Sequence, residues 1–196
     1  MKIISVWNQK GGVGKSTLSL QLAAGFSAKG LKVGIADLDN QRTCLTFFKN
    51  AEKPEFTVFK DYPTSKPDLD ILICDHSPER NEENDPASMS DLILIPVSPS
   101  AIDAWSTIPA LDSLSKRHKT KRLVIINRFQ SSRKLMADFI DTFDHDFVMK
   151  ERSIYARTIA GFGTVFAPRN LPIFAHGIRD AKKEINELIK KIEVLL

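Results

Sequence analysis

The sequence is poor in cysteine and has no long apolar run. Its 196 residues include only Cys44 and Cys74, which form no CxxC pair, so an iron–sulfur cluster is not expected and both thiols are expected to be small, reduced, buried side chains. No apolar stretch approaches the roughly 20 residues that span a bilayer, and the first residues lead directly into a strand-like run rather than a secretion signal. We therefore expect a cytoplasmic protein.

The charge of the chain is divided unevenly along its length. The overall composition is ordinary for a globular protein, with 42% apolar and 27% charged residues and a formal charge of +4. The length of the chain suits one domain over residues 1–196. Residues 1–115 hold 11 Lys/Arg against 15 Asp/Glu, whereas residues 116–196 hold 17 against 9. The basic half could bind a polyanion or could be an ordinary solvated surface, and composition does not decide between the two.

Apolar runs alternate with helical patterns along the chain. Continuous Val/Ile/Leu runs are typical of strands covered on both faces, so the pattern predicts an α/β fold with a doubly wound, mostly parallel sheet and helices on each side. Gly30 stands where a helix-ending glycine belongs. We expect strands at 2–7, 32–36, 70–74, 91–97 and 122–127, an edge strand at 56–59, and helices at 16–29, 43–49, 100–117, 133–143 and 180–195.

A glycine-rich segment lies between the first expected strand and the first expected helix. Residues 10–17, the phosphate loop, read Lys-Gly-Gly-Val-Gly-Lys-Ser-Thr, and such glycines let the backbone turn its N–H groups toward an anion. Lys15 would reach the β- and γ-phosphates of a nucleotide, and the Ser16 hydroxyl would bind Mg²⁺. A simple glycine-rich turn is the alternative, which the strand–loop–helix order makes improbable. The expected nucleotide-binding residues are Gly11, Gly12, Val13, Gly14, Lys15, Ser16 and Thr17.

Carboxylates follow two of the expected strands. Asp37 and Asp39 come after the second strand, and Asp75 comes after the apolar run 70–74. Because ligands of parallel α/β sheets bind beyond the carboxyl ends of the strands, these side chains should converge on the phosphate loop. Asp75 is placed like a Walker B aspartate, which holds Mg²⁺ directly or through water, although an aspartate after a strand is also a common turn former.

The phosphate loop departs from the standard pattern and resembles that of the ParA/MinD ATPases. Gln9 replaces the first glycine and Lys10 opens the loop, at the position of that family's signature lysine. The resemblance implies ATP and Mg²⁺ as ligands and a nucleotide-sandwich homodimer, in which Lys10 reaches the partner's bound phosphates. The similarity is greatest to short, ParF-type plasmid partition ATPases, because no helix-turn-helix precedes the loop.

Other segments fit the same family with small departures. The run Asp37-Leu38-Asp39-Asn40-Gln41 is similar to its second acidic motif, with Asn40 in place of proline; by that resemblance Asp37 lies near Mg²⁺ and Asp39 orients the attacking water. The resemblance thus makes Lys10, Lys15 and Asp39 the catalytic candidates, and Ser16, Asp37 and Asp75 the metal-binding ones. His76, after Asp75, is interpreted as a tolerated loop residue.

Asn127 ends the expected strand 122–127 and matches the position whose side chain pairs with the adenine edge in that family. An asparagine amide supplies both a donor and an acceptor, which suits adenine, although a strand-end asparagine is also a common turn residue. The resemblance continues to the last helix, but it is specific only in the loop and the acidic motifs.

The family resemblance implies an ATPase that dimerises with ATP and positions a cargo on a surface. We expect partition of plasmid or chromosomal DNA, or of a protein cargo, by non-specific DNA binding on the nucleoid and stimulation by a ParB-like adaptor protein. The alternatives are a metabolic ligase of the dethiobiotin-synthetase type and a MinD-like membrane ATPase. The amphipathic segment 182–196 could lie on a membrane, but its stripe is more typical of a helix packed on the sheet.

Overall fold

Seven parallel strands form the sheet at the centre of the molecule. The computed structural model describes residues 1–79, 85–100, 105, 107–109, 120–168 and 176–196. The strands lie in the order β3-β2-β4-β1-β5-β6-β7, and every neighbouring pair is parallel. Their bounds are β1 Lys2–Val6, β2 Val33–Leu38, β3 Thr57–Phe59, β4 Ile71–His76, β5 Leu92–Val97, β6 Lys121–Phe129 and β7 Phe147–Lys150.

The central strands are apolar on both faces, as their continuous Val/Ile/Leu runs predict. Leu92 and Leu94 of β5 belong to the large core cluster, whereas Ile93 and Ile95 of the same strand belong to a second cluster with Trp7. Because successive side chains of a strand point to opposite faces, these clusters lie on opposite sides of the sheet. The predicted fold class, α/β with a parallel, doubly covered sheet, is confirmed.

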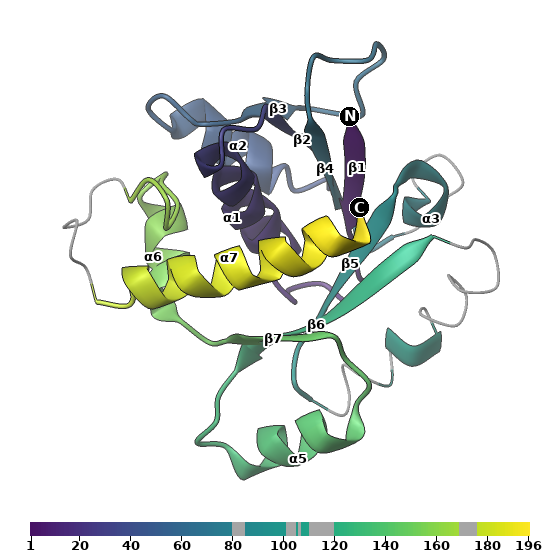
Figure 1. Cartoon of the computed structure of the whole chain (residues 1–196), viewed down its shortest axis with the longest axis vertical. Helices are drawn as coiled ribbons and strands as arrows, with labels where there is room; N and C mark the ends of the chain where they lie inside the picture. Colours follow the sequence, from purple (N-terminus) through teal and green to yellow (C-terminus); the bar gives the residue numbers. More distant parts are fainter. Residues whose placement is uncertain (80–84, 101–104, 106, 110–119, 169–175) are drawn as a thin grey trace.

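The large core cluster lies between the sheet and a group of four helices (Figure 1). These are α1 Lys15–Ala28, α2 Thr43–Asn50, α6 Ser153–Ala160 and α7 Ile178–Leu195. Helix α7 crosses α1 closely at Gly25, where an added Cβ would come within 2.6 Å of the Ile189 side chain. Gly30 follows α1 with φ +88°, and its N–H bonds the Ser27 carbonyl, so it ends the helix as predicted.

Helices α3 and α5 lie outside this group. Helix α3 spans Pro86–Met89, and α5 spans Lys134–Thr142 and has no buried residue. Figure 1 shows α5 set apart from the other helices, beyond β6 and β7. Most of the predicted helix 100–117 lies outside the described residues, although residue 105 and residues 107–109 are helical.

Several elements differ from the sequence prediction. Strand β7 and helix α6 were not expected, and β2, β4 and β6 each extend two residues beyond their predicted ends. Asp37 and Asp75 therefore lie within strands, and His76 is not a loop residue: it is the buried last residue of β4, with its Nε2 2.8 Å from the Ser5 hydroxyl. The extra residues stay in the sheet because β2 and β4 continue to pair with each other through Leu38 and His76.

Both cysteines are free and buried, as expected. Among the helices that the structure describes, none combines the length and the apolarity required to cross a bilayer.

Candidate functional site

The phosphate loop curls around the carboxyl end of β1. Gly12 and Gly14 have φ of +78° and +98°, a backbone region that side chains disfavour, so glycine is required at these two bends. The buried Asn8 side chain fixes the entry to the loop: its Oδ1 accepts from the Lys10 N–H at 2.9 Å, and its Nδ2 donates to the Pro96 carbonyl at 2.8 Å. The loop is therefore shaped before any ligand binds.

Lys15 lies at the start of α1 with its side chain folded back over the loop. Its Nζ donates to the Lys10 carbonyl at 3.1 Å and to the Asn8 carbonyl at 3.3 Å. Burial lowers the pKa of Lys15, while the nearby carboxylates of Asp75 and Asp39 oppose that shift. Hydrogen bonds from an ammonium group to neutral carbonyl oxygens are weaker than those to an anion, so Lys15 can readily exchange these partners for a phosphate.

Asp75 is fully buried at the end of β4 and is held from two helices. Its Oδ1 accepts from the Ser19 hydroxyl of α1 at 3.1 Å, and its Oδ2 from the Cys44 thiol of α2 at 3.3 Å. Burial raises the pKa of Asp75 to about 6, and hydrogen bonds from Ser16, Cys44 and Ser19 oppose the increase. The carboxyl of Asp75 therefore takes up a proton more readily than an exposed aspartate does, and a bound cation would favour its ionised form.

Asp37 and Asp39 lie beside Asp75 at the same edge of the sheet. Asp37 pairs with Asp75 in the register of β2 and β4, and its carboxylate accepts from the Leu45 N–H at 2.8 Å. Burial raises the pKa of Asp37, although this backbone hydrogen bond opposes the shift. Asp39 is only half-buried, and its Oδ1 accepts from the Gln41 N–H at 2.9 Å. The three carboxylates thus converge at one end of the sheet.

The oxygen ligands at this edge of the sheet suit Mg²⁺, which keeps water and phosphate ligands, better than a metal ion that is coordinated by protein groups alone. Among the described residues there is no group of three or more His, Cys, Asp or Glu side chains arranged to hold an ion. Mg²⁺ typically takes one or two protein oxygens and completes its shell with water and phosphate oxygens. The Ser16 hydroxyl and the buried carboxylate of Asp75, whose pKa Ser16 lowers, are two oxygen ligands of this kind.

Two cavities meet at the phosphate loop. The loop cavity, of about 230 Å³, contains Lys15 and Asp39 in its wall; the β7–α6 cavity, of about 370 Å³, opens between β6, β7 and α6. The loop cavity is lined by Gly11, Gly12, Gly14, Lys15, Ser16, Thr17, Asp39, Gln41, Thr43, Pro78 and Arg128. The β7–α6 cavity is lined by Gly14, Thr17, Asn127, Arg128, Lys150, Glu151, Arg152, Ser153, Tyr155 and Ala156.

Asn127 connects β6 to the phosphate loop. Its Nδ2 donates to the Val13 carbonyl at 2.8 Å, and its Oδ1 accepts from the Arg128 N–H at 3.0 Å. The amide packs so closely on Gly14 that a Cβ there would lie 2.4 Å from Nδ2. Asn127 borders the β7–α6 cavity as an adenine-binding residue would, but its amide hydrogen bonds go to backbone groups; adenine recognition stays a prediction.

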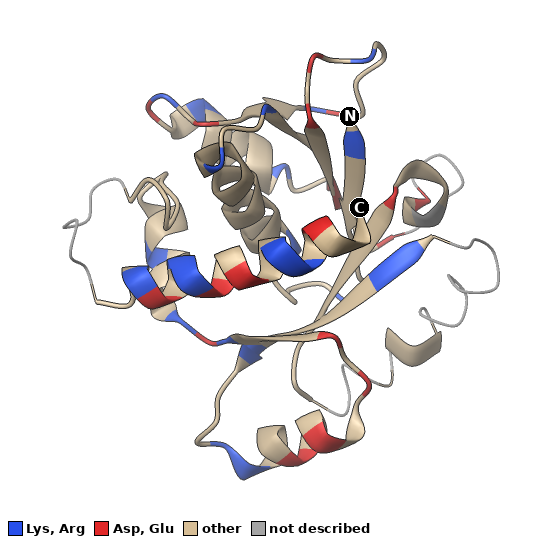
Figure 2. Cartoon of the chain, viewed as in Figure 1, with Lys and Arg blue, Asp and Glu red and all other residues tan. Residues whose placement is uncertain are grey.

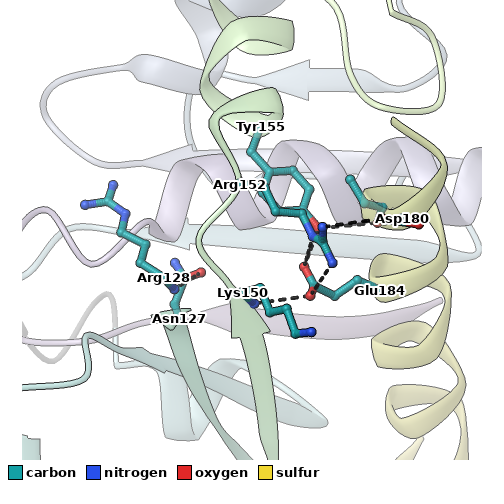
Figure 3. Close-up of polar contacts among 8 residues, drawn as sticks. Asn127, Arg128, Lys150, Arg152, Tyr155, Asp180 and Glu184 are labelled. Carbon is teal, nitrogen blue, oxygen red and sulfur yellow. Dashed lines mark hydrogen bonds and ion pairs between the residues drawn. The ribbon is translucent and has the colours of Figure 1, made fainter. Parts of the chain in front are cut away.

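A buried polar cluster supports the far wall of the β7–α6 cavity. Glu184 of α7 accepts from the Tyr155 hydroxyl at 2.8 Å, from Arg152 Nε at 3.3 Å and from the Lys150 N–H at 3.1 Å. Arg152 also lies 3.9 Å from Asp180 (Figure 3). The cluster connects β7, α6 and α7, so this wall is fixed to the C-terminal helix.

The structure brings most of the predicted site residues together. Lys15, Ser16, Thr17, Asp39 and the loop glycines line one cavity, and Asp37 and Asp75 lie beneath them in adjacent strands. The Val13 side chain is buried in the protein instead, and only its carbonyl faces Asn127. Lys10 lies exposed at the mouth of the loop.

Sequence reasoning missed Asn8, Ser19 and Cys44, which hold the loop and Asp75. Ser19 follows Lys15 by one helical turn, so helix periodicity could have placed it on the side of Asp75. No signal in the sequence places Cys44 there, because its position depends on how α2 packs against the sheet.

Comparison with known proteins agrees with this geometry. Residues 4–160 match the CobQ/CobB/MinD/ParA nucleotide binding domain. The chain belongs to this family. A match over most of the chain, together with the loop and the carboxylates described above, leaves no need for another assignment.

Two relatives and one solved structure illustrate how similar the chain is to known members of the family. The chain is 24% identical to maintenance of carboxysome distribution protein A of Halothiobacillus neapolitanus over 96% of this chain and 95% of that one. It is 35% identical to protein ParA of Rhizobium radiobacter over 61% and 59% of the two chains. An aspartate-to-alanine variant of McdA from Cyanothece, solved with ATP, has a TM-score of 0.76 at 19% identity, covering 98% of this chain and 96% of that one.

Proposed function

We propose that this protein is a Mg²⁺-dependent ATPase of the ParA/MinD type that partitions or positions a DNA or protein cargo. The observation that carries the proposal is the loop cavity, whose wall contains Lys15, Asp39 and the loop glycines, with Asp75 held beneath by Ser19. The similarity to a carboxysome-distribution protein, to a ParA protein and to an ATP complex of McdA supports it.

The chain's own residues suffice for positioning a triphosphate. The N–H groups of residues 11–16 would bind phosphate oxygens, and Lys15 would exchange its two carbonyl partners for the β- and γ-phosphates. Ser16 and Asp75 would hold Mg²⁺, which neutralises phosphate charge when bound. Asp39, half-buried and in the same cavity, would orient the attacking water, and no covalent chemistry by the protein is needed.

ATP-dependent dimerisation is part of the proposal. Lys10 lies exposed beside the loop, so a second copy facing this surface could receive it at its own phosphates. The role of Lys10 rests on resemblance to the family. It predicts that Lys10→Ala lowers ATP hydrolysis while ATP binding by one chain persists.

DNA is the proposed surface, which would make the protein nucleoid-associated in the cytoplasm. The apolar stripe of α7 that could have favoured a membrane is buried instead: Ile185, Leu188 and Ile192 have no exposed surface. Figure 2 shows basic and acidic residues intermixed along this helix. The exposed basic candidates for DNA contact are Arg128, Arg133, Lys134, Lys150, Arg157 and Arg179; Arg152 is engaged by Glu184, and Arg169 lies outside the described residues.

DNA retention in the presence of different nucleotides tests the proposal. Filter binding of non-specific DNA is measured with ATP, with ADP and without nucleotide, at low and high salt. We expect retention only with ATP, decreasing steeply with salt as counterions are released. Asp39→Ala should retain DNA with ATP for longer, because hydrolysis is lost. Equal retention with ATP and ADP, or none with either, would exclude a nucleotide switch on DNA.

A metabolic ATP-dependent ligase is the second candidate, because the family includes CobQ and CobB by its description. Such an enzyme would hydrolyse ATP only with its small-molecule substrate. A ParB-like adaptor should instead stimulate hydrolysis if partition is correct.

A further inference from the structure

Arg128 lies in a strained backbone conformation beside the phosphate loop. Its φ is +61°, in the left-handed region, and the register of β6 with β7 shifts between Ile126 and Phe129. A non-glycine residue in this region is strained, and such irregularities in a strand redirect a side chain. The bulge thus sets the direction of the Arg128 side chain at the end of β6.

The guanidinium groups of Arg128 and Arg152 differ in their ion pairs. Both arginines border the β7–α6 cavity, but Arg152 is engaged by Glu184 and Asp180. In the part of the chain that the structure describes, Arg128 forms no ion pair, and only its backbone N–H has a hydrogen-bond acceptor. Figure 3 shows the two side chains pointing away from each other, with Arg128 clear of the Glu184 cluster.

Arg128 also lines the loop cavity, so it stands where the two cavities meet. Among the residues that the structure describes, Gly14, Thr17 and Arg128 line both cavities. A nucleotide with its phosphates over the phosphate loop and its nucleoside in the β7–α6 cavity would cross this junction. The atoms at the crossing would be the ribose 5′-oxygen and the α-phosphate.

We propose that Arg128 binds the α-phosphate of a nucleotide bound in its own chain; this deepens the proposed ATPase function and rests on it. A guanidinium presents paired N–H donors that match two phosphate oxygens and carries a charge that does not titrate. The strained bulge brings this group to the junction. Because ATP and ADP both carry an α-phosphate, Arg128 should bind both with equal preference.

Nucleotide affinity of matched variants tests the assignment. Binding of ATP and of ADP, each with Mg²⁺, is measured calorimetrically in wild type, Arg128→Ala, Arg128→Gly and the control Lys49→Ala. Lys49 is an exposed cation on α2 that lines neither cavity. Arg128→Gly accepts the positive φ, so its unfolding temperature should stay close to that of wild type and its affinity loss cannot be assigned to misfolding.

Both Arg128 variants should lose about 10-fold in affinity for ATP and for ADP alike, as expected for one charge-assisted contact. Lys49→Ala should bind as wild type does. Unchanged ATP and ADP affinity in the Arg128 variants would overturn the assignment, and so would a loss confined to ATP, which would place Arg128 at the γ-phosphate. A loss of DNA retention with nucleotide affinity intact would also overturn it. If wild type itself binds neither nucleotide, the proposed function fails instead.

Discussion

The Cys44 thiol donates a hydrogen bond to the Asp75 carboxylate at 3.3 Å, and so connects α2 to the carboxyl end of β4. Ser19 binds the other carboxylate oxygen from α1. The aspartate proposed to hold Mg²⁺ is therefore oriented by two helices, and such supporting contacts commonly matter nearly as much as the ligand itself.

Cys44→Ala should weaken Mg²⁺ binding. Loss of the thiol donor leaves one carboxylate oxygen of Asp75 without that partner, so the Mg²⁺ concentration for half-maximal ATPase should rise by about 10-fold. Cys44→Ser, which keeps a donor, should show a smaller increase. The measurement is ATPase rate against Mg²⁺ at fixed ATP. An unchanged Mg²⁺ requirement in both variants would limit Cys44 to packing.

The free protein should lose stability as pH rises through the titration of Asp75. Burial raises the pKa of Asp75 from 3.8 to about 6, so the native state binds this proton more tightly than the unfolded state does. The contribution favours folding below pH 4 and is lost between pH 4 and 6. It corresponds to roughly 2–3 kcal/mol in the free energy of unfolding.

Asp75→Asn removes this titration, so a comparison with wild type separates the contribution of Asp75 from that of the other carboxyl groups. Urea unfolding without nucleotide or Mg²⁺ should show that the substitution stabilises the protein more at pH 7 than at pH 4.5. An equal effect at both pH values would mean that the native Asp75 has an ordinary pKa.

Gly14→Ala should be far more damaging than Gly11→Ala, although both lie in the same loop. At Gly14 φ is +98° and a Cβ would come 2.4 Å from Asn127 Nδ2, whereas at Gly11 nothing lies within 4 Å. We expect a loss of about 2 kcal/mol or more in unfolding free energy for Gly14→Ala and within about 0.5 kcal/mol for Gly11→Ala. Thermal unfolding of the free protein measures both. Similar losses would contradict the loop geometry.

Asn127→Ala separates two roles of its amide. If the hydrogen bond to Val13 matters most, the variant should lose affinity for ATP and GTP by the same factor, because the loop itself is loosened. If the amide reads the adenine edge, only ATP affinity should fall. The structure favours the first result, and competition binding with both nucleotides distinguishes them.

The strand and helix order was predictable because the apolar runs are long and continuous. Strand β7 was not, since Phe147–Lys150 offers four residues with only Met149 buried. Helix α6 has only eight residues, and its buried Tyr155 donates a hydrogen bond to Glu184, 29 residues away. Short elements of this kind are stabilised by tertiary contacts that no local pattern contains.

The site residues that directly follow strands were predictable from their positions in the sequence. The loop, Asp37, Asp39 and Asp75 could be placed because parallel strands end at one edge of a sheet. The contacts Cys44–Asp75 and Asn127–Val13 could not, since they depend on how α2 packs and where β6 bends. Arg128 was visible in the sequence only as one basic residue among many, and its φ singles it out.

Calorimetric titration of wild type and Lys15→Ala with ATP in Mg²⁺ buffer tests the central claim most directly. Wild type should bind one ATP per chain, and Lys15→Ala should show no measurable binding while keeping its folded circular dichroism spectrum. A wild type that fails to bind ATP, or a Lys15→Ala variant that binds it with unchanged affinity, would contradict the assignment of residues 10–17 as the nucleotide site.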